Sequence, residues 1–339
     1  MIRFTNDYSQ GCHPSILEAL QATNLEGNFG YSMDPHTEHA RQLIRQAIGR
    51  PDADVHLLVG GTQANATAIS AFLRPHEAVI AAESGHICTH ETGAVEATGH
   101  KCIACPSPDG KLTPAAIRAA VAAHPNEHTV KPAMVYISQT TEVGTLYRFE
   151  ELAALRAICD ELGLILFIDG ARLGSALAAG AVTLPQMAQV ADAFYIGGTK
   201  NGALFGEAMV LLNEKLKPDF RYLIKRHGGM LAKGWLLGIQ FETLMQGGLY
   251  EDLARHANTQ ALRLRDGAAA LGIPFATESI SNQQFLILPD EVAERLARQV
   301  SFEVSGKPDG GHTIARFVTS WATDPADVDT LLEILRGLL

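Results

Sequence analysis

The chain alternates short apolar runs with longer stretches in which apolar residues recur every three or four positions. The short runs hold too few residues for core helices and end in polar or glycine-rich turns, so each predicts a buried β-strand. These runs are residues 55–59, 78–82, 133–137, 164–168, 193–196 and 207–213.

The longer stretches predict helices between the strands, at residues 37–49, 63–73, 113–123 and 150–162. Thr37 is expected to cap the first of these helices and Gly49 to end it. Strands that alternate with helices predict an α/β fold, in which a mostly parallel sheet is covered on both faces.

The pattern changes after residue 248. A long helix is followed by a small α+β arrangement, with strands expected at 284–288, 302–304 and 313–318 and helices at 251–271, 291–300 and from 325 onward. We therefore divide the chain into an N-terminal arm (1–35), a large domain (36–248) and a small C-terminal domain (249–339). The arm is expected to pack on the small domain or on a partner subunit.

The composition narrows the class of protein. The chain has 339 residues, enough for two domains, and 27 Lys and Arg against 37 Asp and Glu give a formal net charge of −10. An acidic chain without a basic block argues against nucleic acid and anionic membranes as partners. The number of cysteines, five, is odd, which disfavours a framework of disulfides. Since the sequence also has no apolar signal core and no membrane-length apolar run, we expect a reducing cytoplasm as its compartment.

Two predicted strands bring charged residues to one edge of the sheet. Asp169 and Arg172 follow one strand, and Thr199 and Lys200 follow the next. Open α/β sheets bind ligands at this edge. An acid and a lysine there suggest pyridoxal phosphate (PLP), whose aldehyde forms a Schiff base with a lysine and whose ring nitrogen a carboxylate keeps protonated. The alternative, a capping Asp and a solvated Lys, is disfavoured by glycines at positions 170, 174, 197 and 198.

Two further features fit the same edge. Gly60, Gly61 and Thr62 lie between a strand and a helix, where free N–H groups and the helix dipole would bind a phosphate, although a simple tight turn is the alternative. His86 follows another strand end, where its ring would stack on a planar cofactor, with an ordinary loop histidine as the alternative.

Three other groups of residues carry weaker signals. Arg316 lies inside a strand, so it must pair with an acid or bind a substrate carboxylate. The cationic segment 220–248 predicts a solvated helix face, or else a phosphate clamp or subunit contact. A metal site is disfavoured because its ligands do not form closely spaced pairs on a rigid turn; the candidates are His86, Cys88, His90, His100, Cys102 and Cys105.

Several blocks, in order and over nearly the whole chain, resemble the threonine aldolases among PLP-dependent enzymes of aspartate aminotransferase fold (fold type I). The blocks are FTNDYS, GNFGYSMDPHT, GGTQAN, ESGHI, LFIDGARLG, GGTKNG and RFVTSW. The pair IDGAR and GGTKNG, one strand apart, is quite specific. The resemblance implies a sheet of seven-stranded type in the large domain, and homodimers or homotetramers with shared active sites.

The resemblance also implies roles for individual residues. Lys200 would bind the cofactor aldehyde, Asp169 would pair with the ring nitrogen, and His86 would stack on the ring. The remaining cofactor contacts implied are Gly61 and Thr62 at the phosphate, Arg172 near the 3′-oxygen, and Thr199. The substrate contacts implied are Arg316 at the carboxylate, Asn6 and Tyr31. Tyr31 and Lys225 or Lys233 would also reach a neighbouring subunit's cofactor.

The activity implied is retro-aldol cleavage of L-threonine or L-allo-threonine to glycine and acetaldehyde. His86 is the expected base for the β-hydroxyl proton, and Glu142 is the second choice. The chain departs from many threonine aldolases at Asn6, where they have serine, and at residues 139–142 (QTTE), where they have a second active-site histidine. The alternatives are another PLP reaction on this fold, β-elimination or transamination, and a non-catalytic metal-binding protein that uses His86, Cys88, His90, Cys102 and Cys105.

Overall fold

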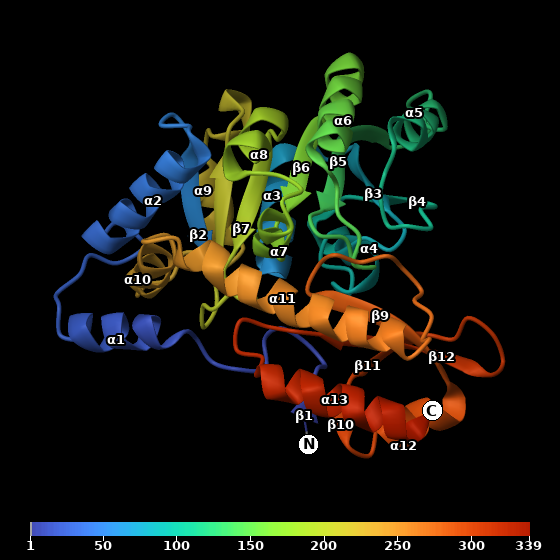
Figure 1. Ribbon diagram of the computed structural model, residues 1–339. Helices are drawn as coiled ribbons and strands as arrows, with labels where there is room; N and C mark the ends of the chain where they lie inside the picture. The colour runs from blue at the N-terminus through green and yellow to red at the C-terminus, as the bar shows by residue number, and fades with distance from the viewer. Residues whose placement is uncertain (1) are drawn as a thin grey trace.

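In a computed structural model, which describes residues 2–339, the strands form three sheets (Figure 1). The largest has seven strands in the order β2-β8-β7-β6-β5-β3-β4. The strands from β7 to β4 run parallel, whereas β8 is antiparallel to both β7 and β2. This mostly parallel sheet confirms the predicted α/β class. Its strands are β2 Asp54–Leu58, β3 Glu77–Ala82, β4 Cys102–Cys105, β5 Lys131–Ser138, β6 Ile165–Asp169, β7 Ala193–Gly197 and β8 Glu207–Leu211.

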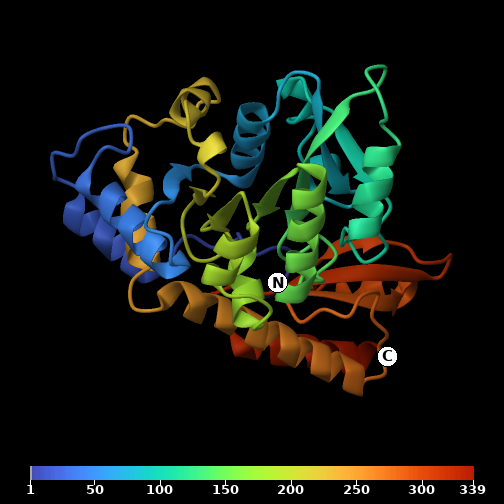
Figure 2. The same cartoon turned by 90° about the horizontal axis from the view of Figure 1, so that it is seen from above.

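Both faces of this sheet are buried, because the side chains that alternate between the two faces along each strand pack against helices on both sides. Along β6, Leu166 and Ile168 face one layer of helices and Phe167 faces the other. Figure 2 shows helices on both sides of the strands. The first layer contains α2 Pro35–Ile48, α5 Pro114–Ala122, α6 Phe149–Leu162, α7 Leu173–Ala178 and α8 Leu184–Val190. The second layer contains α3 Gly61–Phe72, α4 His86–Thr89 and α9 Phe220–Arg226.

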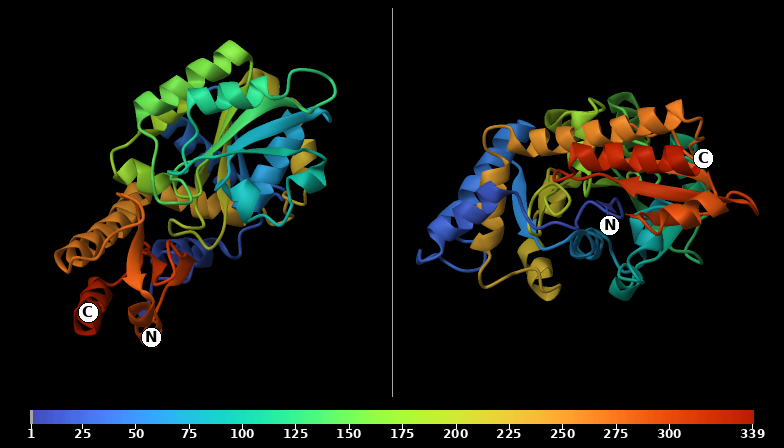
Figure 3. Two further views of the ribbon diagram at one scale, coloured as in Figure 1. Left: turned by 90° about the vertical axis from the view of Figure 1, so that its right-hand side faces the viewer. Right: turned by 60° about the horizontal axis from the view of Figure 1, so that its bottom comes forward.

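The C-terminal part forms its own antiparallel sheet, in the order β11-β12-β9, with a separate apolar core. The helix α11 Leu249–Ala270 packs on α7 of the large sheet and on α13 of the small part, so it joins the two cores. Both views of Figure 3 show α11 and α13 lying side by side next to the small sheet. The elements are β9 Gln283–Pro289, α12 Asp290–Leu296, β11 Glu303–Gly306, β12 His312–Val318 and α13 Pro325–Leu338.

The N-terminal arm packs on the small sheet's side of the molecule, one of the two options expected from sequence. Strand β1 Ile2–Arg3 pairs in parallel with β10 Val300–Ser301, and Phe4 is buried in the C-terminal core. Further along the arm, α1 Pro14–Thr23 packs on α10 Trp235–Leu244, which in turn packs on α2. Two 3₁₀ turns, η1 Glu96–Thr98 and η2 Glu214–Leu216, complete the elements.

Two local predictions are wrong. The residue that caps α2 is Asp34 rather than Thr37, because the Asp34 carboxylate accepts the Thr37 N–H at 2.8 Å and Pro35 starts the helix. The helix expected at 291–300 ends at Leu296, since Val300 is used in β10. The expected stop at Gly49 is confirmed, with a left-handed φ of 68°. Among the helices of the described chain, none combines the length and apolar character needed to cross a bilayer.

Candidate active site

A cavity of about 410 Å³ lies at the carboxyl ends of β6 and β7. Asp169 ends β6, and Lys200 follows β7 in the next turn. Both line the cavity, together with the turn before α3, the short helix α4 and the first residue of β8. The other lining residues are Tyr8, Val59, Gly60, Gly61, Thr62, His86, His90, Glu142, Ala171, Tyr195, Thr199 and Glu207. The structure therefore brings most of the cofactor contacts expected from sequence to one place.

Glycines allow the two strand ends to approach each other. A Cβ atom at Gly170 would lie 1.7 Å from the carbonyl oxygen of Tyr195, and one at Gly197 would lie 2.6 Å from the carbonyl oxygen of Ala171. Any larger side chain would push the end of β6 away from the end of β7. The glycines of IDGAR and GGTKNG thus keep Asp169 and Lys200 at one cavity.

Asp169 is a buried carboxylate with several hydrogen-bond donors. Its Oδ2 accepts from the Tyr136 hydroxyl at 2.6 Å and from Asn65 Nδ2 at 3.0 Å, and its Oδ1 accepts from the Ala171 N–H at 3.0 Å. Burial raises the pKa of Asp169, but these hydrogen bonds outweigh burial and hold the pKa below its usual value. The group is therefore an anion whose donors are all neutral, which suits a protonated ring nitrogen.

A chain of hydrogen bonds links Asp169 to His86. Asn65 Nδ2 also donates to Glu91 Oε1 at 2.7 Å, and the same oxygen lies 2.8 Å from His86 Nδ1. Burial lowers the pKa of His86, but the hydrogen bond to Glu91 and nearby carboxylates outweigh it, so the pKa is raised. The His86 ring stacks on His90, with ring centroids 5.5 Å apart. The contact with Glu91 fixes the ring and leaves Nε2 for other partners.

Lys200 provides an amine suited to attack an aldehyde. Burial and the positive charge of Arg172 lower its pKa, although Asp7, Glu142 and Asp169 oppose them. A lowered pKa increases the neutral fraction of the amine, and the neutral amine is the nucleophile.

The turn at the start of α3 offers free N–H groups. Gly60 is the N-cap, and no side chain caps the first turn. A Cβ atom at Gly61 would lie 3.0 Å from the Tyr195 hydroxyl, so a glycine keeps this space open. An anion would meet unpaired N–H groups and the positive end of the helix dipole here. Together with a buried carboxylate and a lysine amine, this turn fits PLP.

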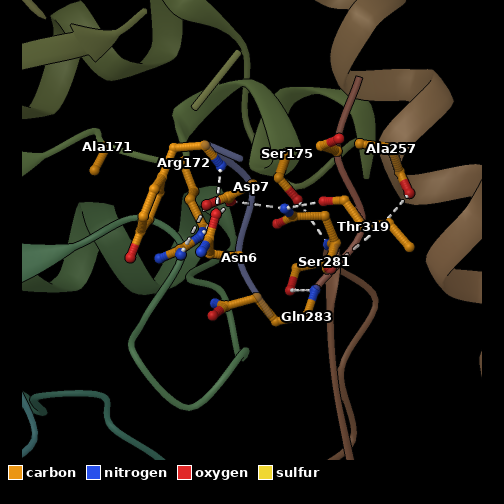
Figure 4. Close-up of polar contacts among 12 residues, drawn as sticks. Asn6, Asp7, Ala171, Arg172, Ser175, Ala257, Ser281, Gln283 and Thr319 are labelled. Carbon is orange, nitrogen blue, oxygen red and sulfur yellow. Dashed lines mark hydrogen bonds and ion pairs between the residues drawn. The ribbon is translucent and has the colours of Figure 1, made fainter. Parts of the chain in front are cut away.

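Arg172 is held by the N-terminal arm. Its Nε and Nη2 donate to the two carboxylate oxygens of Asp7 at 2.7 and 3.1 Å, and Asn282 Nδ2 donates to Asp7 at 2.9 Å (Figure 4). Burial raises the pKa of Asp7, but the charges of Arg172 and Lys200 and the hydrogen bonds from Arg172 and Asn282 together outweigh burial, so the pKa is lowered. The arm, the large sheet and the C-terminal part therefore meet at one buried ion pair.

The structure does not place the expected substrate contacts in the cavity wall. Arg316 on β12 forms an ion pair with Glu303 on β11, its partner in the strand register. Asn6 accepts hydrogen bonds from the Tyr8 N–H at 3.0 Å and the Ser9 hydroxyl at 2.9 Å, and so forms a local turn. Asn6 directly precedes Asp7, whose carboxylate pairs with Arg172.

The residues expected to reach a neighbouring subunit lie on the surface. Tyr31 is half exposed, and the Lys225 amine lies 5.0 Å from the centre of its ring. Lys233 is exposed. In this single chain, they contribute nothing to the cavity wall that the described residues form.

The histidines and cysteines between residues 86 and 105 do not form a metal centre in the described part of the chain. There, no group of three or more His, Cys, Asp or Glu side chains is placed to hold an ion. All five cysteines are free thiols. Cys88 and Cys102 pack against the apolar core of the second helix layer.

Several residues of the site escaped the sequence reasoning. Asp7, Asn65, Tyr136, Glu91 and Glu207 have roles that only the fold reveals. Asp7 and Asn65 lie inside the blocks FTNDYS and GGTQAN, but nothing in the sequence distinguishes them from the other polar residues of these blocks. Glu207 had a clearer signal, because an acid opens the apolar run EAMVL.

The sheet architecture and the groups in the cavity define the class of protein: a PLP-dependent enzyme of aspartate aminotransferase fold (fold type I). An aspartate aminotransferase from Thermus thermophilus shares this fold, with a TM-score of 0.73 at 18% identity, over 100% of this chain and 92% of that one.

Similarity to known proteins identifies the family within this class. The family model of Beta-eliminating lyase matches residues 5–291. The low specificity L-threonine aldolase of a Pseudomonas species is 34% identical, over 99% of this chain and 98% of the relative. A threonine aldolase structure from Leishmania major is 48% identical and superimposes with a TM-score of 0.98, over 100% of this chain and 99% of that one. The chain belongs to the β-eliminating lyase family and, within it, to the threonine aldolases.

Proposed function

We propose that this protein cleaves L-threonine or L-allo-threonine to glycine and acetaldehyde, in a PLP-dependent retro-aldol reaction. The observation that carries the proposal is that the Asp169 carboxylate and the Lys200 amine line one cavity beside the uncapped start of α3. The two Pseudomonas relatives that are 34% identical over nearly their full length, both low specificity L-threonine aldolases, support the same reaction.

Five residues would hold the cofactor. Lys200 Nζ would bind it covalently, Asp169 would pair with the ring nitrogen, His86 would stack on the ring, and Gly61 and Thr62 would bind the phosphate. When bound, PLP accepts the electron pair that is released as the Cα–Cβ bond breaks. Thr199 and Arg172 would complete its surroundings.

The protein's own side chains would bind the substrate and move its protons. Arg316 would bind the carboxylate, helped by Asn6; the buried Arg316 Nε has no hydrogen-bond partner among the described residues, so it has a donor to offer. His86 Nε2 would take the β-hydroxyl proton, since Nδ1 is engaged with Glu91. Glu142, in the cavity wall, is the second candidate.

We also propose that the protein works as a homodimer or homotetramer with shared sites. The arm exposes several large apolar side chains, as expected for a surface that a second copy covers. Tyr31 and Lys225 or Lys233 would then reach the neighbouring site. The exposed side chains are Tyr8, Leu25, Phe29, Tyr31 and Met33. The free thiols favour a reducing cytoplasm as the setting.

Product analysis tests the reaction. Incubation of the PLP-loaded protein with L-threonine should give acetaldehyde and glycine in equal amounts. Release of 2-oxobutanoate would instead indicate β-elimination, and PLP-amine formation with a keto acid would indicate transamination. Repeating the assay with the four threonine stereoisomers would establish the preference at Cβ.

A further inference from the structure

Glu207 occupies a position between the two turns of the site. It is the first residue of β8, and in the sheet register it lies between Leu58 on β2 and Gly197 on β7. Because β8 is antiparallel to both neighbours, it begins where they end. Strand β2 continues into the Gly60–Gly61 turn, and β7 continues into the turn with Thr199 and Lys200. Glu207 therefore lies next to both turns.

The Glu207 side chain is buried and only half satisfied. It is 3% exposed, and its Oε1 accepts a hydrogen bond from the Thr199 hydroxyl at 2.8 Å. The Thr199 hydroxyl in turn accepts from the Gly206 N–H at 3.0 Å. Glu207 Oε2 is buried without a hydrogen-bond partner among residues 2–339.

The surroundings of Glu207 disfavour its charge. Burial raises its pKa to about 8, and Asp169 adds to the effect, while Thr199 and Lys200 oppose it. The phenols that face it, Tyr195 on β7 and Tyr250 on α11, have raised pKa values through burial and carry no charge at neutral pH. From α10, the apolar Leu237 and Phe241 lie near Gly206, and the neutral Gln240 accepts hydrogen bonds from the Leu204 and Phe205 N–H groups. These surroundings favour the protonated form of the carboxyl group.

We propose that Glu207 belongs to the phosphate-binding site of the cofactor, where it keeps its proton and donates a hydrogen bond from Oε2 to a phosphate oxygen. The proposal rests on the function and the phosphate position proposed above. Among the described residues that line the cavity, Lys200 is the one Lys or Arg side chain, and the reaction engages it elsewhere. A neutral acid supplies a donor to a dianionic phosphate, whereas its carboxylate would repel the phosphate.

The inference predicts a specific pH dependence. Cofactor affinity should fall as Glu207 ionises, by up to about tenfold per pH unit above pH 8, since binding then requires a proton. In Glu207→Gln, the amide oxygen still accepts from Thr199 and the amide nitrogen donates at every pH. Glu77→Gln is the matched control, because Glu77 also opens a buried strand, β3, but is absent from the cavity wall.

The experiment measures the dissociation constant of PLP from the apoprotein between pH 6.5 and 9.5. The dissociation constant of the wild type divided by that of Glu207→Gln should stay constant up to neutral pH and rise above pH 8. The dissociation constant of Glu77→Gln should follow that of the wild type at every pH. With pyridoxal, which lacks the phosphate, the ratio should not change with pH. A constant ratio with PLP, or an equal rise with pyridoxal, would overturn the proposal.

A second measurement needs no variant. The ³¹P resonance of the cofactor bound to the wild-type protein should shift as Glu207 ionises, with a midpoint above pH 8, because the affinity can fall with pH only if the bound phosphate raises the pKa of Glu207 further. Phosphate itself finishes ionising near pH 6, so it does not account for this shift. A resonance that does not move up to the pH at which the affinity for PLP stops falling would refute the role of Glu207. Two other results would contradict the proposed function rather than the role of Glu207: a borohydride-reducible chromophore that persists in Lys200→Ala, or threonine that remains uncleaved by the wild-type protein.

Discussion

The Asp7–Arg172 pair allows a quantitative prediction for the substitution Asp7→Asn. The side chains of Asp7 and Arg172 are 1% and 7% exposed, and two hydrogen bonds join them. Removing one partner of a buried ion pair costs about 3–5 kcal/mol, because the other charge stays buried without compensation. Asparagine keeps one acceptor oxygen, so we expect a loss near the lower limit, about 3 kcal/mol in the free energy of unfolding.

Urea unfolding of the apoprotein, followed by circular dichroism, measures this loss. The matched control is Glu161→Gln, which removes the charge from a bidentate pair with Arg118 that is 55% exposed on both sides. The control should barely change stability, since water screens exposed pairs. In the double variant Asp7→Asn/Arg172→Met, the buried charge is gone, so its loss should be smaller than the sum of the two single losses.

The pH dependence checks the same reasoning. Burial alone would raise the pKa of Asp7, but Arg172, together with Lys200 and Asn282, lowers it below 3.8, the value in the unfolded chain. The contribution of Asp7 is therefore complete above the unfolded value and disappears as the pH falls through the folded value. The difference between wild type and Asp7→Asn should shrink in that range. If Asp7→Asn costs no more than Glu161→Gln at neutral pH, the pair does not stabilise the fold as argued.

Three further substitutions test the site. Lys200→Ala should abolish the borohydride-reducible visible chromophore, and a normal chromophore in the purified variant would exclude this lysine as the cofactor anchor. Arg316→Ala should raise KM for threonine and spare PLP affinity; if PLP binding collapses instead, Arg316 serves the cofactor or the fold. Glu91→Gln removes the group that raises the pKa of His86, so the acid limb of the kcat profile should move to lower pH. An unmoved limb would point to a base other than His86.

The periodic part of the fold could be predicted because each strand of the large sheet is a short apolar run between polar turns. The edge that carries Asp169 and Lys200 followed from the same pattern, since both residues come directly after such runs. Side chains at the ends of parallel strands meet whatever the details of packing. The cavity wall contains both residues.

Long-range pairing could not be predicted. Nothing in residues 2–3 indicates that they pair with residues 300–301, because two-residue strands have no periodicity. The partner of Arg316 could not be predicted for a similar reason. An arginine in a strand can pair with an acid of the protein or bind a substrate carboxylate, and only the strand register shows that Glu303 lies opposite it. Asp7 was missed because its burial depends on contacts with Arg172 and Asn282, far away in sequence.

The pairing of β1 has a consequence for biosynthesis. The Phe4 carbonyl accepts the Val318 N–H at 2.7 Å, and β1 pairs with β10, so residues 2–4 can find these partners only after residues 300–318 have been synthesised. On the ribosome, the large sheet can form before residues 300–318 are available to pair with residues 2–4. Translation that stops before residue 318 would therefore yield a protein that contains Asp169 and Lys200 but leaves residues 2–4 without these partners and accessible to chaperones and proteases.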